Sequence, residues 1–105
     1  MILITGASGN IGRKLIPLLL QTGQPIRVFV RDERKVAHLD ACVDRVVGDL
    51  DKPETLIPAV KGIERIFLVT YETRQDINVS EAAKRAGVKH IVKLSTLEAT
   101  EHKIQ

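Results

Sequence analysis

The residues with the clearest chemical potential are three glycines, Gly6, Gly9 and Gly12, in the segment TGASGNIG. A short apolar run precedes this segment, and a stretch with helical spacing of apolar residues follows it. In that context the first glycine permits a tight turn, the second lets backbone amides approach an anion, and the third lets the helix pack closely. Unpaired amides at a helix N-terminus also attract negative charge. The pattern therefore predicts a site for the pyrophosphate of a dinucleotide.

Other residues of the segment extend this predicted site. Ser8 and Asn10 can donate hydrogen bonds to phosphate oxygens, and Ile11 stands beside them at the predicted start of the helix. The alternative is that the glycines only form a turn. The phosphate loop of nucleoside triphosphatases does not fit, because Arg13 and Lys14 follow Gly12 and the chain has no Gly-Lys-Ser/Thr.

The elements that position this turn are predicted from runs of Val, Ile and Leu. Continuous apolar runs are typical of strands buried on both faces. The predicted strands span residues 1–5, 26–31, 45–47, 65–70 and 90–95. A buried helical stripe is expected at Ile11, Leu15, Leu18 and Leu19. Right-handed crossovers then predict a three-layer α/β fold of Rossmann type, with a parallel five-stranded sheet of order 3-2-1-4-5 and helices on both faces.

Several residues mark where helices begin, end or bend. Asp51, with Glu54 three residues later, predicts a helix N-cap with its capping-box partner. Pro17 and Pro58 fall inside predicted helices, where each removes a backbone hydrogen bond, so we expect kinks there. Left-handed glycines are expected to end helices at Gly23, Gly62 and Gly87.

Composition limits the classes to which the chain can belong. Its 105 residues suit a single domain, and the net charge of +3 is spread along the chain, unlike the basic stripe of a nucleic-acid binder. No apolar run is long enough to span a bilayer, and no export signal precedes the first strand. The single cysteine, Cys42, suits a reducing compartment. We therefore expect a cytoplasmic protein that binds neither membrane nor nucleic acid.

Three further segments give the chain a family resemblance. Val-Arg-Asp stands at residues 30–32, Gly-Asp-Leu at 48–50 and Ala-Ala-Lys-Arg-Ala-Gly-Val-Lys-His at 82–90. Together with the G-x-x-G-x-x-G turn, they resemble the NmrA-like branch of the atypical short-chain dehydrogenase/reductase family over essentially the whole chain. The resemblance implies a Rossmann domain that binds a nicotinamide dinucleotide, in a protein of the quinone or carbonyl reductase type.

The residue that ends the second strand discriminates between the two dinucleotides. An arginine there suits the 2′-phosphate of NADP(H), whereas a carboxylate suits the free 2′-hydroxyl of NAD(H). Arg31 stands at this position and Lys35 follows one turn later, which favours NADP(H). The resemblance implies the same assignment. Asp32 leaves NAD(H) as the alternative, because a shift of one residue would present its carboxylate, and the charges could also form only a solvated loop.

Residues after the third and fourth strands complete the predicted cofactor site. The carboxyl edge of parallel strands is where ligands bind in open α/β sheets, and Asp49 and Leu50 stand there. By resemblance, Asp49 accepts a hydrogen bond from the adenine amino group and Leu50 packs on the ring. Thr70 and Tyr71, after the fourth strand, are expected to border the nicotinamide ribose.

No catalytic residue can be assigned. The Tyr-x-x-x-Lys pair of short-chain dehydrogenases is missing, since Tyr71 is the only tyrosine and Gln75 stands four residues later. Ser95 and Thr96 are interpreted as packed hydroxyls at a strand end, because neither is expected to have a His or Lys base that would make it a nucleophile. We interpret His102, near Glu98 and Glu101, as part of a solvated terminus, so no metal site is predicted.

The chain is interpreted as one cofactor-binding domain, residues 1–105, truncated after the fifth strand and without a substrate domain. Three functions stay open: the cofactor-binding part of a reductase, a non-catalytic redox sensor or regulatory module, and a remnant that binds weakly. An unpaired fifth strand at the sheet edge predicts a homodimer that covers this strand or the face beside it. The alternative is that residues 96–105 fold back over the edge and leave a monomer.

Overall fold

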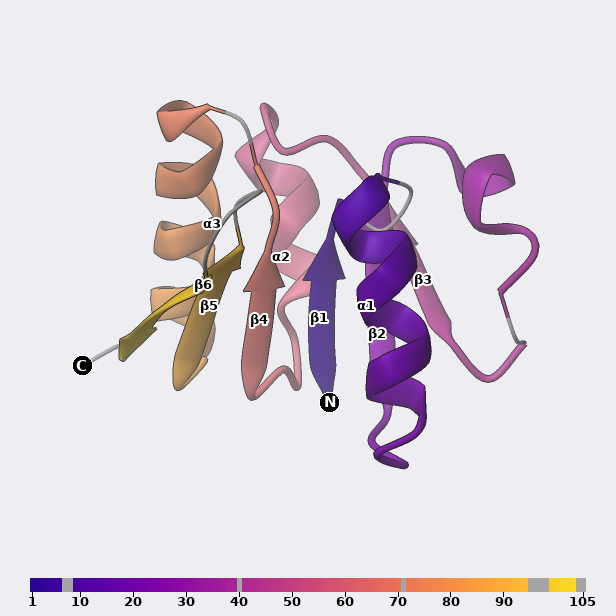
Figure 1. Ribbon diagram of the computed structural model, residues 1–105. Helices are drawn as coiled ribbons and strands as arrows, with labels where there is room; N and C mark the ends of the chain where they lie inside the picture. Colours follow the sequence, from indigo (N-terminus) through magenta and orange to yellow (C-terminus); the bar gives the residue numbers. More distant parts are fainter. Residues whose placement is uncertain (7–8, 40, 71, 95–98, 104–105) are drawn as a thin grey trace.

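Figure 1 shows the computed structural model, which describes residues 1–6, 9–39, 41–70, 72–94 and 99–103. Within these ranges one sheet has the strand order β3-β2-β1-β4-β5-β6. The strands are β1 (Ile2–Thr5), β2 (Ile26–Val30), β3 (Asp44–Val47), β4 (Arg65–Leu68), β5 (His90–Leu94) and β6 (Ala99–Lys103). β1 to β5 pair in parallel, which confirms the predicted order 3-2-1-4-5 and the Rossmann-type α/β fold.

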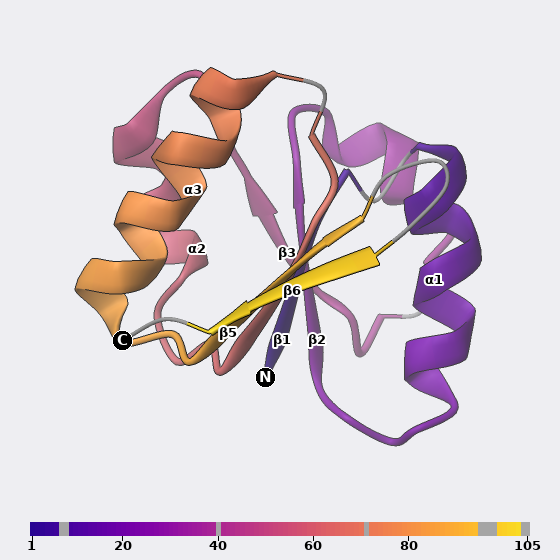
Figure 2. The same cartoon turned by 60° about the vertical axis from the view of Figure 1, so that its left-hand side comes forward.

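Helices cover both faces of the sheet, as predicted. In the described residues these helices are α1 (Asn10–Leu20), α2 (Leu56–Ala59) and α3 (Thr73–Ala86), and short 3₁₀ turns span Glu33–Val36 and Pro53–Thr55. Figures 1 and 2 show α1 on one face of the sheet and α2 with α3 on the other. None of the helices in the described part of the chain has the length and apolarity needed to cross a membrane.

Two hydrophobic cores lie on opposite faces of the sheet. On one face Leu3 and Ile66 pack in a cluster with Val79 of α3, and on the other Ile4 packs in a cluster with Ile16 of α1. All four residues of β1 are buried. The continuous apolar run at the start of the chain follows from this position, because both faces of a central strand are covered.

The apolar stripe of α1 differs from the prediction at one residue. Leu18 was expected in the buried stripe, but its exposed fraction is 61%, whereas that of Ile16 is 1%. Successive residues are about 100° apart around a helix, so Leu18 points away from the sheet when Ile16 points toward it. Pro17 is also on the exposed side, and α1 continues through it.

The left-handed glycines were predicted correctly, and the helix N-cap at Asp51 was not. Gly23, Gly62 and Gly87 all have a left-handed backbone, with φ of +77°, +73° and +79°. The N-cap at Asp51 was wrong, since the 3₁₀ turn starts after Lys52 without a side-chain cap. The amide of Asp51 instead donates to Asp49 Oδ1 at 2.9 Å, because the turn is organised around Asp49.

The expectation that the fifth strand forms an open edge was also wrong. Residues 99–103 form β6, which pairs antiparallel with β5 from His90↔Lys103 to Leu94↔Ala99. This pairing satisfies backbone amides and carbonyls of β5 that would otherwise be unpaired at an edge. The structure therefore confirms the part of the alternative in which the end of the chain folds back beside the fifth strand, and the oligomeric state stays a prediction.

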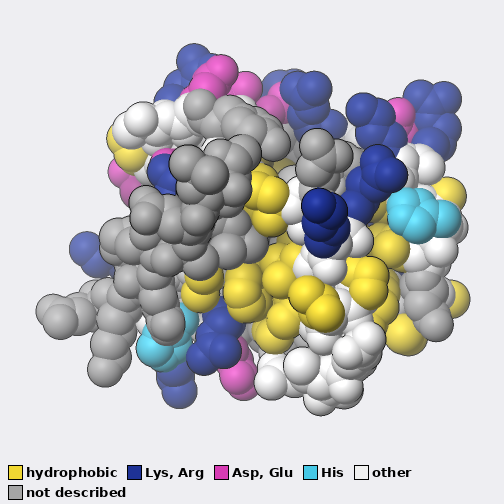
Figure 3. Space-filling model, viewed as in Figure 1, with side chains coloured by type: hydrophobic (Ala, Val, Ile, Leu, Met, Phe, Trp, Pro, Cys, Tyr) yellow, Lys and Arg dark blue, Asp and Glu magenta, His cyan; other side chains and the backbone are white. Residues whose placement is uncertain are grey.

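Two apolar side chains on the side of α1 are only half-buried among the described residues. Phe67 of β4 and Val92 of β5 are register partners, so they share a face, and both are half-buried. Phe67 packs against the core beneath α1, which places the pair on that side of the sheet. Figure 3 shows hydrophobic side chains gathered at the surface near the centre of this side.

Candidate functional site

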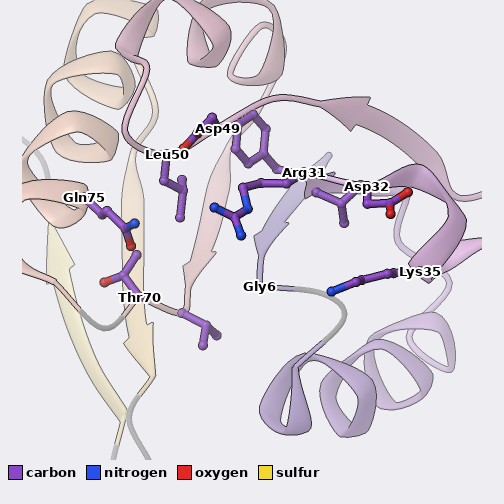
Figure 4. Close-up of a pocket in the computed structure, with 11 residues that line it drawn as sticks. Gly6, Arg31, Asp32, Lys35, Asp49, Leu50, Thr70 and Gln75 are labelled. Carbon is purple, nitrogen blue, oxygen red and sulfur yellow. The ribbon is translucent and has the colours of Figure 1, made fainter.

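A cavity of 510 Å³ lies at the carboxyl ends of the central strands. The strand order reverses between β1 and β4, and open α/β sheets bind their ligands at such a switch point. Figure 4 shows the residues that line the cavity. Six residues of the predicted cofactor site are among them: Gly6, Arg31, Lys35, Asp49, Leu50 and Thr70.

The glycine turn begins where β1 ends. Gly6 has φ of +70°, and a Cβ atom on it would lie 2.9 Å from Cβ of Val69, so a side chain has no room there. The amide of Gly9 donates to the carbonyl of Gly6 at 3.0 Å, which closes the turn. Gly9 is the N-cap of α1, and Gly12 is buried in its first turn. The N-terminus of α1 thus starts beside the cavity, as an anion site requires.

Three predicted residues of this turn receive less or no structural description. Ile11 is half-buried in the first turn of α1. Ser8 and the side chain of Asn10 lie outside the described residues. Their assignment to phosphate contacts stays a prediction.

A buried threonine joins the ends of β1 and β4 at the switch point. Thr5 Oγ1 donates to the carbonyl of Val69 at 3.3 Å and accepts from the amide of Val69 at 2.9 Å. Thr5 is completely buried, so these hydrogen bonds join the end of β1 to the residue that follows β4. They hold Gly6 close to Val69, and both residues line the cavity.

Arg31 and Lys35 bring two cationic side chains to the cavity. Figure 4 shows Arg31 reaching toward the cavity and Lys35 toward the turn at Gly6. Both side chains are exposed, so each guanidinium or ammonium group is accessible to a ligand. An arginine fork and a lysine point charge are suited to binding a phosphate.

Asp32 also lines the cavity, but its carboxylate is engaged by Arg34. Oδ1 accepts from the amide of Arg34 at 3.0 Å and from its Nε at 3.1 Å, and Oδ2 accepts from Nη2 at 2.9 Å. The side-chain hydrogen bonds first, and then the backbone one, hold the pKa of Asp32 below its usual range. Asp32 thereby serves as the N-cap of the turn Glu33–Val36.

The loop after β3 presents Asp49 and Leu50. A Cβ atom on Gly48 would lie 2.6 Å from the ring of Phe29, so this glycine lets the loop approach β2. Thr55 Oγ1 accepts from the amide of Asp49 at 3.0 Å and lies 2.9 Å from its carbonyl oxygen. Asn78 of α3 donates to the carbonyl of Leu50 at 2.8 Å. Thr55 and Asn78 were not predicted as site residues. Asn78 lies 28 positions from its partner Leu50, and Thr55 lies six positions from Asp49 in a loop whose fold the sequence pattern does not give.

The far end of the cavity contains Thr70 and Gln75. Thr70 Oγ1 donates to Asp76 Oδ1, and the other oxygen of Asp76 pairs with Lys93 Nζ. Gln75 was not predicted as a lining residue and comes from the first turn of α3. Tyr71 lies outside the described residues, and so do the strand-end hydroxyls at 95 and 96. Within the described ranges, no group of three or more His, Cys, Asp or Glu could hold a metal ion.

The chain is similar to several known proteins. A family model described as NAD(P)H-binding matches residues 6–105. The NAD(P)H azoreductase of Xenophilus azovorans is 38% identical over 97 residues, which are 88% of this chain and 34% of that protein. The photosystem II assembly factor of Cyanophora paradoxa is 39% identical over 91 residues, which are 86% of this chain and 26% of that protein.

A solved structure gives the same result. The NADPH-dependent quinone oxidoreductase of Escherichia coli, complexed with NADPH, superposes with a TM-score of 0.80 at 34% identity. The match covers 89% of this chain and 36% of that one, so the chain spans about a third of the length of this relative. With the fold, the glycine turn and the family model in agreement, the chain belongs to the NAD(P)H-binding family of NmrA-like, atypical short-chain dehydrogenases/reductases.

Proposed function

We propose that this chain is the NADP(H)-preferring domain of an oxidoreductase that reduces a quinone or carbonyl acceptor. The observation that supports this proposal most is the environment of the two residues after β2. Arg31 and Lys35 line the cavity that contains Gly6, while both carboxylate oxygens of Asp32 accept hydrogen bonds from Arg34. A phosphate therefore meets cations here, and a ribose 2′-hydroxyl meets a carboxylate that already has partners.

The residues of the cavity fit the parts of a dinucleotide. Gly6 leaves backbone in place of a side chain in the turn between β1 and α1, which suits a pyrophosphate. The proposed site has the pyrophosphate on Gly6, Ser8, Gly9, Asn10, Ile11 and Gly12, the 2′-phosphate on Arg31 and Lys35, the adenine on Asp49 and Leu50, and the nicotinamide ribose on Thr70 and Tyr71. When bound, the reduced nicotinamide would supply a hydride, and the chain's own residues bind and orient the dinucleotide.

The acceptor class is inferred from relatives whose names state a reaction, an azoreductase and a quinone oxidoreductase. A second candidate is a non-catalytic redox sensor or regulatory module. One observation favours it: a relative of similar identity is named as an assembly factor and not for a reaction. Different affinities for NADPH and NADP⁺ without turnover of quinones would support this second function.

Calorimetric titration with NADPH and with NADH tests the cofactor proposal. We expect at least about tenfold tighter binding of NADPH, because one charge-assisted hydrogen bond contributes about 1.5–3 kcal/mol. Gly9→Val is the control, since a side chain there would occupy the space of the pyrophosphate and abolish binding of both cofactors. Equal affinities or a preference for NADH would contradict the proposal, and normal binding by Gly9→Val would place the phosphate site elsewhere.

We also propose that two copies of the chain associate as a homodimer. Because β6 covers β5, the contact is assigned to the face beside β5, where Phe67 and Val92 are half-buried. Apolar surface that is shared by neighbouring strands favours association through a two-fold contact.

A further inference from the structure

Three polar side chains form a cluster behind the far end of the cavity. Thr70 follows β4, Asp76 lies in the first turn of α3, and Lys93 lies on β5. Thr70 Oγ1 donates to one carboxylate oxygen of Asp76, and Lys93 Nζ pairs with the other. The side chain of Asp76 is only 19% exposed, and Thr70 is the member that lines the cavity. Asp76 and Lys93 therefore act on the cavity through Thr70.

The charge state of the cluster fixes the direction of the hydroxyl hydrogen bond. A carboxylate paired with an ammonium group has no proton to donate, so it can only accept. The single hydroxyl proton of Thr70 is consequently committed to Asp76, and no donor among the described residues engages the lone pairs of this hydroxyl. Thr70 thus presents a hydrogen-bond acceptor, and the group that it recognises must be a donor.

The position of Thr70 indicates which donor this is. Figure 4 shows Thr70 and Gln75 on one side of Gly6, with Asp32 and Lys35 on the other. If the 2′-phosphate of the adenosine half binds at the cationic end, the nicotinamide half is closest to Thr70. That half carries ribose hydroxyl groups and a carboxamide NH₂, which are donors of the required kind.

We propose that Asp76 and Lys93 are positioning residues that hold the Thr70 hydroxyl as an acceptor for a donor on the nicotinamide half. This inference rests on the proposed function. A purely structural role would differ in its consequences, because a tie between α3 and β5 would affect the binding of every ligand alike. The positioning role affects only ligands that contain the nicotinamide half.

The test compares NADPH with adenosine 2′,5′-bisphosphate, which has the 2′-phosphate but no nicotinamide half. We expect Thr70→Val and Asp76→Asn each to weaken NADPH binding about three- to tenfold, the size of one neutral hydrogen bond, and to leave bisphosphate binding unchanged. Thr70→Ser should retain the wild-type affinity for NADPH. The double variant that combines Thr70→Val with Asp76→Asn should bind NADPH no more weakly than Thr70→Val alone, because Asp76 acts through Thr70.

Glu72→Gln is the matched control, since it removes an exposed carboxylate next to the same helix end, where its partner is Arg74. It should leave both affinities unchanged.

If Asp76→Asn does not fold, Lys93→Met replaces it as the probe of the cluster and should weaken NADPH binding alone. Equal weakening of both ligands, or unchanged NADPH binding by the Thr70 and Asp76 variants, would overturn the inference. A wild type that binds neither ligand would overturn the proposed function as well. If the wild type binds the bisphosphate and the variants bind NADPH with unchanged affinity, only the inference is overturned.

Discussion

Arg31 and Asp32 are neighbours after β2 whose side chains favour different cofactors. In the sequence either one can be aligned with the position that meets the adenosine ribose. The fold separates them by local hydrogen bonding, because Asp32 caps the 3₁₀ turn that starts at Glu33 and accepts three hydrogen bonds from Arg34. Such a cap depends on the backbone conformation at a single residue, and for that reason the sequence alone left both cofactors open.

We predict that Arg31→Ala weakens NADPH binding about tenfold or more and leaves NADH binding nearly unchanged. The variant removes the guanidinium proposed to bind the 2′-phosphate, and such charge-assisted contacts contribute about 1.5–3 kcal/mol. Calorimetric titration of both cofactors measures the effect. Arg85→Ala is the matched control, because it removes the same charge from an exposed residue in the last turn of α3 that does not line this cavity. An equal loss of NADPH affinity in both variants would mean that only the general positive charge of the chain matters.

The Asp32–Arg34 pair also predicts a dependence on pH. Hydrogen bonds from Arg34 lower the pKa of Asp32 in the folded chain. The stability that this pair contributes is therefore fully present above the unfolded pKa and is lost as the pH falls through the lower, folded value. In an NMR titration the carboxyl of Asp32 should have its midpoint below the usual range for aspartate. Arg34→Ala should return the midpoint toward that range, and an unchanged midpoint would show that Arg34 is not the cause.

At the scale of the elements, the turn between β1 and α1 was largely predictable, because its glycine spacing and flanking apolar patterns are local. The contacts that hold the turn were not predictable. Val69, which excludes a side chain from Gly6, and Thr5, which bonds Val69, are 64 residues apart in sequence. β6 was missed for a related reason. Its sequence, ATEHK, lacks the continuous apolar run of a doubly covered strand, because it lies at the edge of the sheet.

Thr5→Val tests the link between β1 and the residue after β4. The replacement keeps the side-chain shape but leaves the buried amide and carbonyl of Val69 without the Thr5 hydroxyl. We expect the free energy of unfolding to fall by about 1–3 kcal/mol, the cost of buried polar groups without partners. Urea denaturation measures this change. Thr5→Ser retains the hydroxyl and should lose clearly less, so similar losses in the two variants would exclude the hydrogen bonds as the cause.

At the scale of the whole molecule, helices of the described residues lie on both faces of the sheet. Figure 1 shows α1 in front of β1 and β2, while α2 and α3 cover the opposite face of the sheet. On the side of α1, Phe67 and Val92 lie on the neighbouring strands β4 and β5 and remain half-buried. From the sequence, the homodimer contact was predicted at the edge of the fifth strand, where no further strand was expected. Because β6 pairs with that edge, we assign the proposed contact to this face instead.

The final prediction is that Val92→Lys dissociates the proposed homodimer. A lysine on this face would have to bury its charge against a second copy, which is costly without a partner. Light scattering at tens of micromolar should give about twice the 11.6 kDa of the chain for the wild type and the single mass for Val92→Lys. Ile77→Lys is the matched control, because Ile77 is a 51% exposed apolar residue on α3, which covers the other face of the sheet. It should remain dimeric, and circular dichroism should show that both variants are folded. A wild-type mass of 11.6 kDa would exclude the homodimer, and equal dissociation by both lysines would place the contact elsewhere.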